Sequence, residues 1–556
     1  MREFSQLQTW RSTFAAQWEE VAALVLPNSK NTFYYGNFNW PGQKNTHQQV
    51  DASGMMALGR FAAICDSLLT PRNMMWHGLA SDSDYVMKDR ASRLWFEKTT
   101  KLLFKHRYDP LANFSAQNQS SYQQLGAFGT QGMFIDEFDA AMYPFVKGIR
   151  YKSIPLGELF IRENHQGLVD GFIRWFKLSA RQAYQKFGPE RFPEILRPAL
   201  EQDSEMLYNF IHRVVPRTDY DPDRLDAKGK PWTSYYISLE GRSLLSEGGY
   251  RTFPAAISRY EQAPGEVYGR SPAMAVLPAL KTLNAEKRTF LKVGHRAADP
   301  VLLTADDGIV DFSLRPGALN KGGVSPDGRP LVQALVSGNV QITKEMMDDE
   351  KLLINDAFLV SLFQILTETP QMTATEVIER TNEKGILLAP TIGGQMSGYL
   401  GPMISRELDV LASLGLLDPM PPRLKEAHGA YTATYTGPLS RAMRAQEAAG
   451  FIRTVETVKE LVNVTQDASL LDTFDFDTAI PAIAEIQAVP FSWMADADMI
   501  AKKRQTRAQA QQRQEAIQAA PAQAAVMKAK VDAAKAGMLP GQMPAQGGAP
   551  LAEQVG

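Results

Sequence analysis

The residues that could carry out chemistry in this chain are few, and their spacing matches no common catalytic pattern. The closest approach to a phosphate-binding loop is Gly323 to Gly328, but Arg329-Pro330 follows it in place of the required lysine and hydroxyl residue. The sequence has no Gly-x-Ser-x-Gly elbow, and its seven histidines include no pair at metal-ligand spacing on one helix. These features argue against an ATPase, a serine hydrolase and a metalloenzyme.

Clustered acidic residues are the second candidate for chemistry. The run Asp219 to Asp223 has the spacing that begins a calcium loop. However, Arg224 stands where the turn glycine belongs and Lys230 where the bidentate glutamate belongs, so a solvated loop is favoured over a cation site. Asp82-Ser83-Asp84 and Asp475-Phe476-Asp477 are more typical of helix starts or turns than of a nuclease pair. We therefore predict that the chain is not an enzyme and needs no cofactor.

The elements that would position a site are clearest between residues 268 and 303. Ser271 is a helix cap, and Pro272 suits the first helical position because proline has no N–H to leave unpaired. Asp299-Pro300 ends the helix, since proline disfavours helical geometry in the residue before it. Apolar residues between these limits recur mostly at three- and four-residue steps, which predicts one amphipathic helix of about 25 residues. They are Met274, Leu277, Leu280, Leu283, Phe290 and Leu291.

A turn-rich insert and a second helix follow. Residues 300 to 338 contain six Gly and four Pro, interrupted by a strand-like alternation in which Val310, Phe312 and Leu314 share a face. A helical pattern then begins at Thr343 and runs to about Leu366. Its apolar positions are Met346, Met347, Leu353, Phe358 and Leu362.

A third helix start lies at Thr373. Glu376 stands three residues later, which makes a capping box, and Met372 can pack against Val377. Proline and glycine at Ala389-Pro390 and Gly393-Gly394 are expected to kink this helix.

In their order and spacing, the segments from Tyr268 to Leu303 and from Met372 to Val377 resemble the head-to-tail connector (portal) proteins of short-tailed, podovirus-type bacteriophages. The resemblance covers roughly residues 1 to 490 and is firmest over 265 to 415. It implies an α+β, ring-forming subunit with the portal fold. The implied parts are a wing (1–265), stem helix 1 (266–299), a β-rich clip (300–340), stem helix 2 (341–366), a tunnel loop (367–372), a channel helix with wing return (373–435), a helical crown (436–495) and an Ala/Gln-rich basic tail (496–556).

The resemblance also assigns roles to particular residues. It places a tunnel loop at Thr367, Glu368, Thr369, Pro370, Gln371 and Met372, and the channel helix start at Thr373 and Glu376. It makes Lys281, Lys287, Arg288, Lys292 and Arg296 a basic face of the stem. Clip docking residues would be Asp306, Asp307, Phe312, Arg315, Lys321 and Arg329, and the basic tail would present Lys502, Lys503, Arg504, Arg507 and Arg513.

The function implied by the resemblance is a homo-dodecameric ring at the special capsid vertex, which conducts the genome during packaging and ejection and nucleates procapsid assembly. Implied partners are the terminase large subunit, tail adaptor and tail tube proteins, the major capsid protein and scaffold, internal core proteins, and double-stranded DNA bound without sequence specificity. The chain would assemble in the host cytoplasm and reside in the virion, with no membrane contact. The alternative is another virion or packaging component, such as a nuclease, an ATPase or an internal core protein. It is disfavoured by the missing phosphate loop and catalytic cluster.

Charge is balanced overall but segregated locally. The chain has 59 basic and 61 acidic residues, which suits a channel through which a duplex must slide better than a phosphate-gripping protein. Residues 270–297 carry six basic residues against one acidic, a net of +5, whereas residues 344–356 carry a net of −3. Either both are solvated faces, or each helix meets its opposite within or between subunits. Residues 499–535 carry a net of +6 and are expected to be helical up to Pro521.

Elsewhere the sequence predicts a soluble, mixed helix-and-strand chain. Its 556 residues suggest three or four domains, its one cysteine excludes an internal disulfide, and its longest apolar stretch, Ala357 to Leu366, is too short to span a bilayer. The N-terminus begins an amphipathic pattern instead of a signal sequence. Helices are expected at 1–26, 50–69, 92–105, 438–463 and 478–488, strands at 133–135, 158–162, 168–176 and 232–239, and a helix capped by Ser179 and Gln182.

Overall fold

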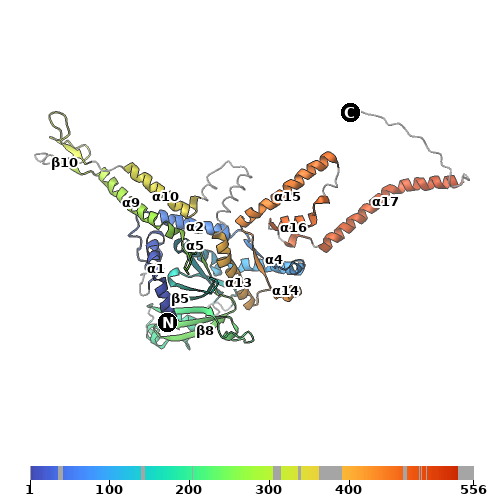
Figure 1. Ribbon diagram of the computed structural model, residues 1–556, viewed down its shortest axis with the longest axis horizontal. Helices are drawn as coiled ribbons and strands as arrows, with labels where there is room; N and C mark the ends of the chain where they lie inside the picture. Colours follow the sequence, from blue (N-terminus) through green and yellow to red (C-terminus); the bar gives the residue numbers. More distant parts are fainter. Residues whose placement is uncertain are drawn as a thin grey trace. The chain divides into compact units, whose positions relative to one another are not determined.

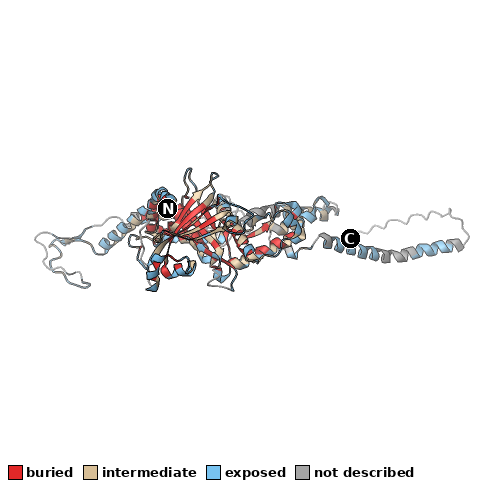
Figure 2. Cartoon of the chain, turned by 90° about the horizontal axis from the view of Figure 1, so that it is seen from below, coloured by how far each residue is buried: buried red, intermediate tan, exposed pale blue. Residues whose placement is uncertain are grey.

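The computed structural model describes residues 2–34, 42–138, 145–202, 205–304, 313, 315–335, 340–361, 391–466, 472–486, 489, 491–495 and 497–535 (Figure 1). The chain divides into two compact units, Met1–Val489 and Pro490–Gly556. Buried residues concentrate in the sheets and helices of the first unit, whereas the described part of the second is exposed (Figure 2). Across the described residues, no helix is long and apolar enough to cross a membrane.

Antiparallel sheets form the centre of the first unit. A five-stranded sheet has the order β4-β5-β6-β7-β8, and a three-stranded sheet has the order β3-β2-β9. Buried and exposed residues alternate along β3, as they do in a strand that covers a core with one face. The strands are β2 (Thr130–Glu137), β3 (Ile149–Ser153), β4 (Leu159–Glu163), β5 (Val169–Ser179), β6 (Leu207–Pro216), β7 (Trp232–Ser238), β8 (Ser243–Tyr250) and β9 (Ala255–Arg259). The four strand segments expected from the sequence lie in β2, β4, β5 and β7 and are confirmed.

Helices α1, α2 and α5 pack on one another, and α5 covers the three-stranded sheet. Trp18, Phe61 and Phe128 lie at their junction and are at most 1% exposed. Their bounds are α1 (Arg2–Val25), α2 (Ser53–Leu69) and α5 (Phe114–Phe128), and the other helices of this region are α3 (Asp84–Met87), α4 (Arg90–Arg107), α6 (Ala180–Phe187) and α7 (Arg197–Glu201). The helices expected at 1–26, 50–69 and 92–105 are confirmed, and Ser179 and Gln182 form the expected capping box. Short 3-10 turns are η1 (Pro27–Ser29), η2 (Pro110–Ala112), η3 (Leu156–Glu158), η4 (Glu194–Leu196) and η5 (Ala227–Gly229).

A helix pair, α9 (Leu277–Ala298) and α10 (Val340–Ala357), lies side by side, with a strand pair joined to its far end (Figure 1). The strand pair is β10 (Leu302–Thr304) and β11 (Val332–Ala334), which run antiparallel. The helix expected from Ser271 is broken at Val276 into α8 (Pro272–Ala275) and α9. The break has a physical cause, because the ring of Pro278 would clash with the carbonyl of Met274 in a continuous helix.

Helix α10 differs from the expected element at both ends. It begins at Val340 instead of Thr343 and ends at Ala357 instead of near Leu366, with Leu359 in the left-handed region at φ 61°. Met347 and Phe358 are buried as the apolar pattern predicts, but Met346 and Leu353 are 51% and 53% exposed. The inward position expected for those two side chains is therefore wrong in the isolated chain. The expected alternation of Val310, Phe312 and Leu314 lies outside the described residues.

The chain returns to the body through a helix that is described from residue 391. Gly393 and Gly394 are helical, and Ala389-Pro390, the other expected kink site, lies outside the described residues. The irregularity that the structure describes is a π-helical turn, η6 (Met396–Leu400), before α13 (Gly401–Ser413). Pro402 explains it, since proline has no N–H for the regular helical bond. Thereafter come α14 (Pro422–Glu426) and β12 (Thr432–Tyr435), which pairs with β1 (His77–Ala80).

Two more helices complete the first unit and one forms the second. Helices α15 (Pro438–Thr465) and α16 (Phe476–Ile486) confirm the two helices expected in this region. After the short turn η8 (Phe491–Trp493), α17 runs from Ala497 to Lys535. It continues through Pro521, where the sequence predicted its end. Helix-favouring alanine and glutamine on both sides explain why one lost hydrogen bond does not end it.

Candidate functional site: the α9–α10 helix pair and its anchor

A segment of tightly fitted backbone, Tyr268–Pro272, fixes the start of the helix pair to the body. Gly129, at φ 76°, and Gly269 lie so close that a Cβ on either would overlap the carbonyl oxygen of the other. The Gly269 N–H donates to the Thr130 hydroxyl at 2.9 Å. Ser271 both donates to the carbonyl of Ala127 (2.8 Å) and accepts the N–H of Met274 (3.0 Å). The predicted cap is therefore also a tether to the end of α5.

A buried arginine supports the same anchor. The Arg11 guanidinium on α1 donates to the carbonyls of Phe33 (2.9 Å) and Leu156 (3.0 Å), and it stacks over the Phe160 ring. Burial lowers the pKa of Arg11 to about 10, and the nearby Tyr268 partly opposes this shift. Sequence reasoning missed Arg11. Arg11 lies three residues before Phe14, on the apolar face of the N-terminal helix, and this position is the local signal that its side chain could be buried.

The contact between α9 and α10 combines apolar packing with two like charges. Met347 of α10 belongs to the hydrophobic core that contains Trp18 and Phe61, and the partly buried Phe290 of α9 packs against this core. Glu286 and Glu350 face each other across the pair, and within the described chain neither Oε2 atom has a hydrogen-bond partner. Burial, and then the charge of Glu350, raise the pKa of Glu286. Hydrogen bonding to Lys351 and, across the pair, the charge of Lys287 lower the pKa of Asp348. The contact therefore carries both a like-charge and an opposite-charge interaction, and apolar packing and anchoring add to them.

The predicted basic face of α9 is brought together along one helix, but its members have different surroundings. Lys281 forms a 2.6 Å ion pair with Glu20 of α1, and Arg288 donates to the carbonyl of Gln48 at 2.6 Å. Lys287 lies over the ring of Phe290 on its own helix, 5.5 Å from the ring centre. Lys292 and Arg296 are exposed. In the described side chains, no ion pair joins α9 to α10.

Buried polar groups hold the returning helix against the sheet. Gln395 accepts from the Gln131 amide (2.9 Å) and from the Ser258 hydroxyl (2.6 Å). The Tyr399 hydroxyl donates to Asn118 Oδ1 at 2.8 Å. These bonds run from η6 and the turn before it to β2, β9 and α5, so they fix where the chain re-enters the body.

A fully buried ion pair adds to this bracing. Arg107 at the end of α4 pairs with Glu407 of α13, and Tyr151 donates to Glu407 Oε1 at 2.6 Å. Desolvation is the largest influence on the guanidinium and acts to lower its pKa, but Glu407 outweighs it and the pKa of Arg107 is raised. Burial and the charge of Arg107 hold the pKa of the adjacent His77 well below its usual value. The partners are 300 residues apart, so no local pattern could have revealed the pair.

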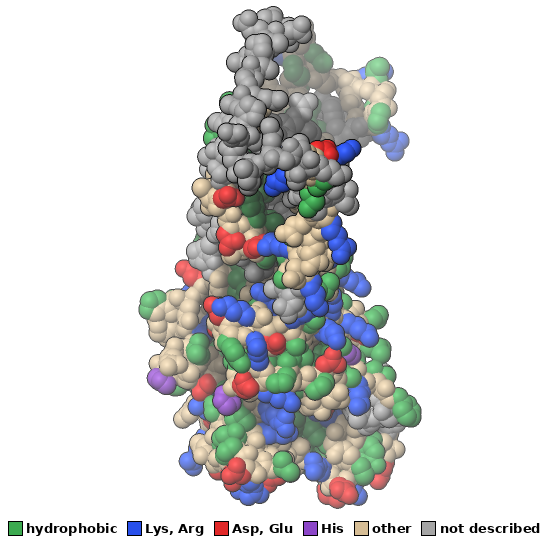
Figure 3. Space-filling view, turned by 90° about the vertical axis from the view of Figure 1, so that its right-hand side faces the viewer, with side chains coloured by type: hydrophobic (Ala, Val, Ile, Leu, Met, Phe, Trp, Pro, Cys, Tyr) green, Lys and Arg blue, Asp and Glu red, His purple; other side chains and the backbone are tan. Residues whose placement is uncertain are grey.

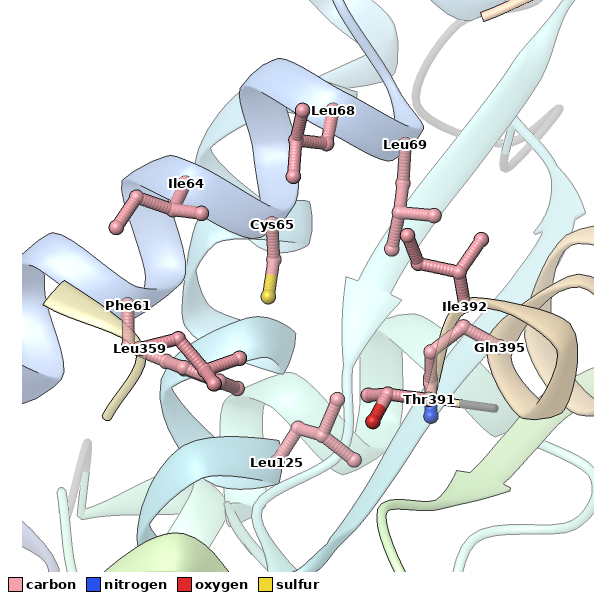
Figure 4. Close-up of a pocket in the computed structure, with 10 residues that line it drawn as sticks. All are labelled: Phe61, Ile64, Cys65, Leu68, Leu69, Leu125, Leu359, Thr391, Ile392 and Gln395. Carbon is pink, nitrogen blue, oxygen red and sulfur yellow. The ribbon is translucent and has the colours of Figure 1, made fainter. Parts of the chain in front are cut away.

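A small cavity of about 20 Å³ lies beside the returning helix (Figure 4). The thiol of Cys65 points into it from α2, and Leu359, Thr391 and Gln395 are among the lining residues. Burial raises the pKa of Cys65 to about 12, so the thiol is un-ionised and unreactive at neutral pH. The lining offers no acid–base pair for catalysis.

The remaining predicted residues are scattered. Arg315, Lys321 and Arg329 are exposed in the insert, and Asp306, Asp307, Phe312, the loop Thr367–Met372, Thr373 and Glu376 lie outside the described residues. Lys502, Lys503, Arg504, Arg507 and Arg513 are exposed along α17. Over the face shown in Figure 3, basic and acidic side chains are interspersed among apolar ones.

Ion pairs occupy the acidic loop that resembled a calcium site. Asp219 pairs with Arg217 (3.3 Å) and Lys228 (3.6 Å), and Arg224 pairs with Asp226 (2.5 Å). No group of three or more metal-ligating residues was found among the described residues. Basic side chains of the loop and its flanks thus pair with two of its carboxylates, Asp219 and Asp226.

Together these features define a mixed helix-and-strand subunit built around a braced helix pair. Residues 1–494 match the family described as bacteriophage head to tail connecting protein, and this chain belongs to that family. The probable portal protein of Bordetella phage BPP-1 is 26% identical over 92% of this chain and 91% of its own length. The portal protein of Salmonella phage epsilon15 is 27% identical over 93% and 92%.

Solved phage-like particles also contain similar chains. One belongs to the virion of a native gene transfer agent particle, with 12% identity, a TM-score of 0.34 and coverage of 75% of this chain and 91% of that chain. Another belongs to the neck of an empty particle of this kind, with 10% identity, a TM-score of 0.32 and coverage of 72% and 85%.

Proposed function

We propose that this chain is a portal subunit, twelve copies of which close into a ring at one capsid vertex and conduct the genome during packaging and ejection. The observation that carries the proposal is the projection made by α9, the β10–β11 pair and α10, anchored at Tyr268–Pro272, in a member of the head-to-tail connecting family. Relatives described as portal proteins align with this chain over more than nine-tenths of its length, which supports the same role for its whole fold.

In this proposal α9 and α10 are the stem, and residues 300–340 are the clip. Residues 1–265, with the returning segment 391–435, are the wing, and α15 and α16 belong to the crown. The described contacts support grouping the returning segment with the wing, since α13 contacts β2, β3 and β9. The proposed tunnel loop, Thr367–Met372, contains no basic residue and would let DNA slide without a phosphate grip.

The proposed partners follow from the ring's position. The clip would receive the terminase large subunit first and the tail adaptor and tail tube proteins later. The wing would meet the major capsid protein and scaffold and so nucleate the procapsid in the host cytoplasm. DNA passes through without sequence recognition, and internal core proteins would meet the crown and tail. No observation favours the alternative of a packaging nuclease or ATPase.

The test is the mass and shape of the purified full-length protein. Native mass spectrometry should give a species of about twelve 61.7 kDa subunits, and electron-microscope class averages should show a closed ring with a central channel. A protein that stays monomeric at all concentrations, including in the presence of scaffold, would refute the portal assignment.

A further inference from the structure

The outward faces of the α9–α10 pair carry opposite charges. On α9 Leu280 and Leu283 are buried, and the exposed Lys281, Arg288 and Lys292 lie on the side away from α10, where Lys281 also pairs with Glu20 and Arg288 with the carbonyl of Gln48. On α10 the buried residues Met347 and Ile354 face inward, and three exposed acidic residues lie opposite them. These are Glu345, Asp349 and Asp356.

The two sets have the same spacing read in opposite directions. Lys281, Arg288 and Lys292 are separated by seven and four residues, and so are Asp356, Asp349 and Glu345. The helices run antiparallel, because β10 and β11, which adjoin the end of α9 and the start of α10, pair antiparallel, and Glu350 faces Glu286. We count positions along each helix axis from the facing pair Glu286 and Glu350. Each basic residue of α9 then lies within one residue of the height of the matching acidic residue of α10, a difference of about 1.5 Å.

Within one chain these stripes do not meet, because they lie on faces that point away from each other. Inside the pair Glu286 faces the like charge of Glu350, while Lys287 acts on Asp348 across the contact. The acidic side also leaves large apolar side chains in solvent, with Met346 51%, Leu352 60% and Leu353 53% exposed. An isolated chain therefore leaves the basic stripe only partly paired, through Lys281 and Glu20, and leaves an apolar strip exposed.

We propose that a second copy of this chain covers these faces, so that the basic stripe of one α9 pairs with the acidic stripe of the next copy's α10. The inference rests on the proposed ring and names one of its contacts. A ring repeats a head-to-tail contact between two different faces, which is what opposite stripes on one helix pair provide. Equal levels on both helices place three ion pairs in register when neighbouring copies stand side by side without an axial shift.

We call these three ion pairs between neighbouring copies the ladder. Its main effect is on the register of the two copies and on the choice of partner. An exposed ion pair is worth only about 0–1 kcal/mol, whereas like charges placed opposite each other oppose association. The apolar strip beside the acids, Met346, Leu352 and Leu353, supplies burial that the ion pairs alone lack. Lys281 would share its charge between Glu20 of its own chain and Asp356 of the neighbour.

Charge reversal in two variants tests this contact, and rescue of each variant by the other separates it from the intrachain loss of the Lys281–Glu20 pair. The first variant carries Lys281→Glu, Arg288→Glu and Lys292→Glu, which makes both stripes acidic. The second carries Glu345→Lys, Asp349→Lys and Asp356→Lys, which makes both stripes basic. We expect each variant alone to lose ring formation by about ten-fold or more, equivalent to about 1.4 kcal/mol. Mixed in equal amounts, they should form rings in which the two variants alternate, as counted by native mass spectrometry.

The control is Lys502→Glu, Lys503→Glu and Arg507→Glu in α17, which changes the charge equally and should leave rings intact. Circular dichroism and thermal unfolding establish that each variant folds. If wild-type chains form no ring, the portal function itself fails. If wild-type rings form but either reversed variant assembles normally, or the folded variants do not rescue each other, the ladder is overturned. Normal rings that retain less DNA at low salt would likewise overturn it, because they would assign the basic stripe to phosphates.

Discussion

At Gly269 a hydrogen is the largest side chain that the surroundings tolerate, because the backbone of Gly129 occupies the space of a Cβ. Gly294, near the far end of α9, is the opposite case, since a Cβ there would meet nothing within 4 Å. Gly269 thus allows the close backbone contact at the anchor, whereas Gly294 only lowers the stability of an exposed helix. Substitutions at these two glycines should therefore change the stability of the protein in opposite directions.

We expect Gly269→Ala to destabilise the protein by about 1–3 kcal/mol, the usual cost of forcing an extra group into a packed site. Gly294→Ala should stabilise it by about 0.5–1 kcal/mol, because alanine is the better helix former. Chemical unfolding of both variants beside the wild type measures the difference. Equal stability of the two variants would show that the Gly129–Gly269 contact does not hold the anchor.

The facing glutamates make the helix pair sensitive to pH. The pKa of Glu286 is raised above 4.5 by burial and by Glu350, so the folded pair binds a proton more readily than the unfolded chain. The stability that this proton contributes is complete below the unfolded pKa and is lost as the pH rises through the folded value. Hydrogen exchange in α9 and α10, corrected for intrinsic rates, should therefore show more opening at pH 8 than at pH 5.

Replacing Glu286 with glutamine should remove most of this pH dependence, because the side chain no longer ionises. The matched control is Glu456→Gln, an exposed residue of α15. That control should leave the pH profile of α9 and α10 unchanged. A wild-type protein whose helix pair opens equally at both pH values would contradict the assignment.

One more residue-scale expectation concerns the proposed tunnel loop. Glu368→Lys would place a ring of cations where the proposal puts the narrowest part of the channel. Phosphate contacts would then slow packaging or ejection, most strongly at low salt, without altering ring stability. Glu368→Gln is the control, since it removes the charge without adding a cation. Packaging rates that do not change with salt in the lysine variant would argue against a channel position.

At the scale of elements, the projection combines a rigid base with a separable tip. The strand Leu302–Thr304 pairs with Val332–Ala334 next to α9 and α10, whereas the segment from Asn320 to Gly328 bonds to residues outside those strands. The N–H of Ser325 donates to the carbonyl of Arg329 at 2.8 Å, and the carbonyl of Gly323 accepts from the N–H of Leu331 at 3.0 Å. The tip can therefore be shortened without unpairing the strands at its base.

Deleting Asn320–Gly328 should leave ring assembly intact but abolish terminase-dependent packaging and tail attachment. The physical reason is that the deletion removes exposed docking surface and leaves the buried anchor untouched. Electron microscopy of the rings and an in vitro packaging reaction measure the two effects separately. Normal packaging by the shortened protein would contradict the clip assignment.

At the scale of the whole molecule, the second unit is organised differently from the first. Its helix α17 carries exposed Lys502, Lys503 and Arg507, and it has no apolar stripe with which to pack. A basic helix of this kind attracts phosphate electrostatically, with an affinity that falls as salt rises. An internal core protein with an acidic surface would satisfy the same charges.

Truncation after Asp498 should leave rings intact and reduce DNA retention at low salt or the yield of filled heads. The control is truncation after Lys535, which keeps α17 and removes the last 21 residues. A Lys502→Gln, Lys503→Gln, Arg507→Gln variant tests whether charge alone accounts for the loss. Failure of the shorter chain to form rings would instead make α17 an oligomerisation element.

The sequence by itself determined the elements whose cause is local. Ser271 and Pro272 start a helix, Ser179 and Gln182 cap another, and the alternating pattern from Trp232 to Leu239 predicts β7, because caps and side-chain periodicity act over a few residues. It also determined the opposite charges of the 270–297 and 344–356 segments, which are visible without any fold. The local rules misplaced the break at Val276 and the end of α17, where one proline's effect depends on its neighbours.

Only the tertiary structure decided which distant residues meet. Arg107 and Glu407, Gly129 and Gly269, and Glu286 and Glu350 are pairs that chain folding alone brings together. It also turned the basic stripe of α9 and the acidic stripe of α10 away from each other, whereas the sequence did not decide whether oppositely charged helices meet within one subunit or between subunits. The reason is that packing buries the apolar face of each helix first, and the charged faces are then left for whatever lies outside the chain.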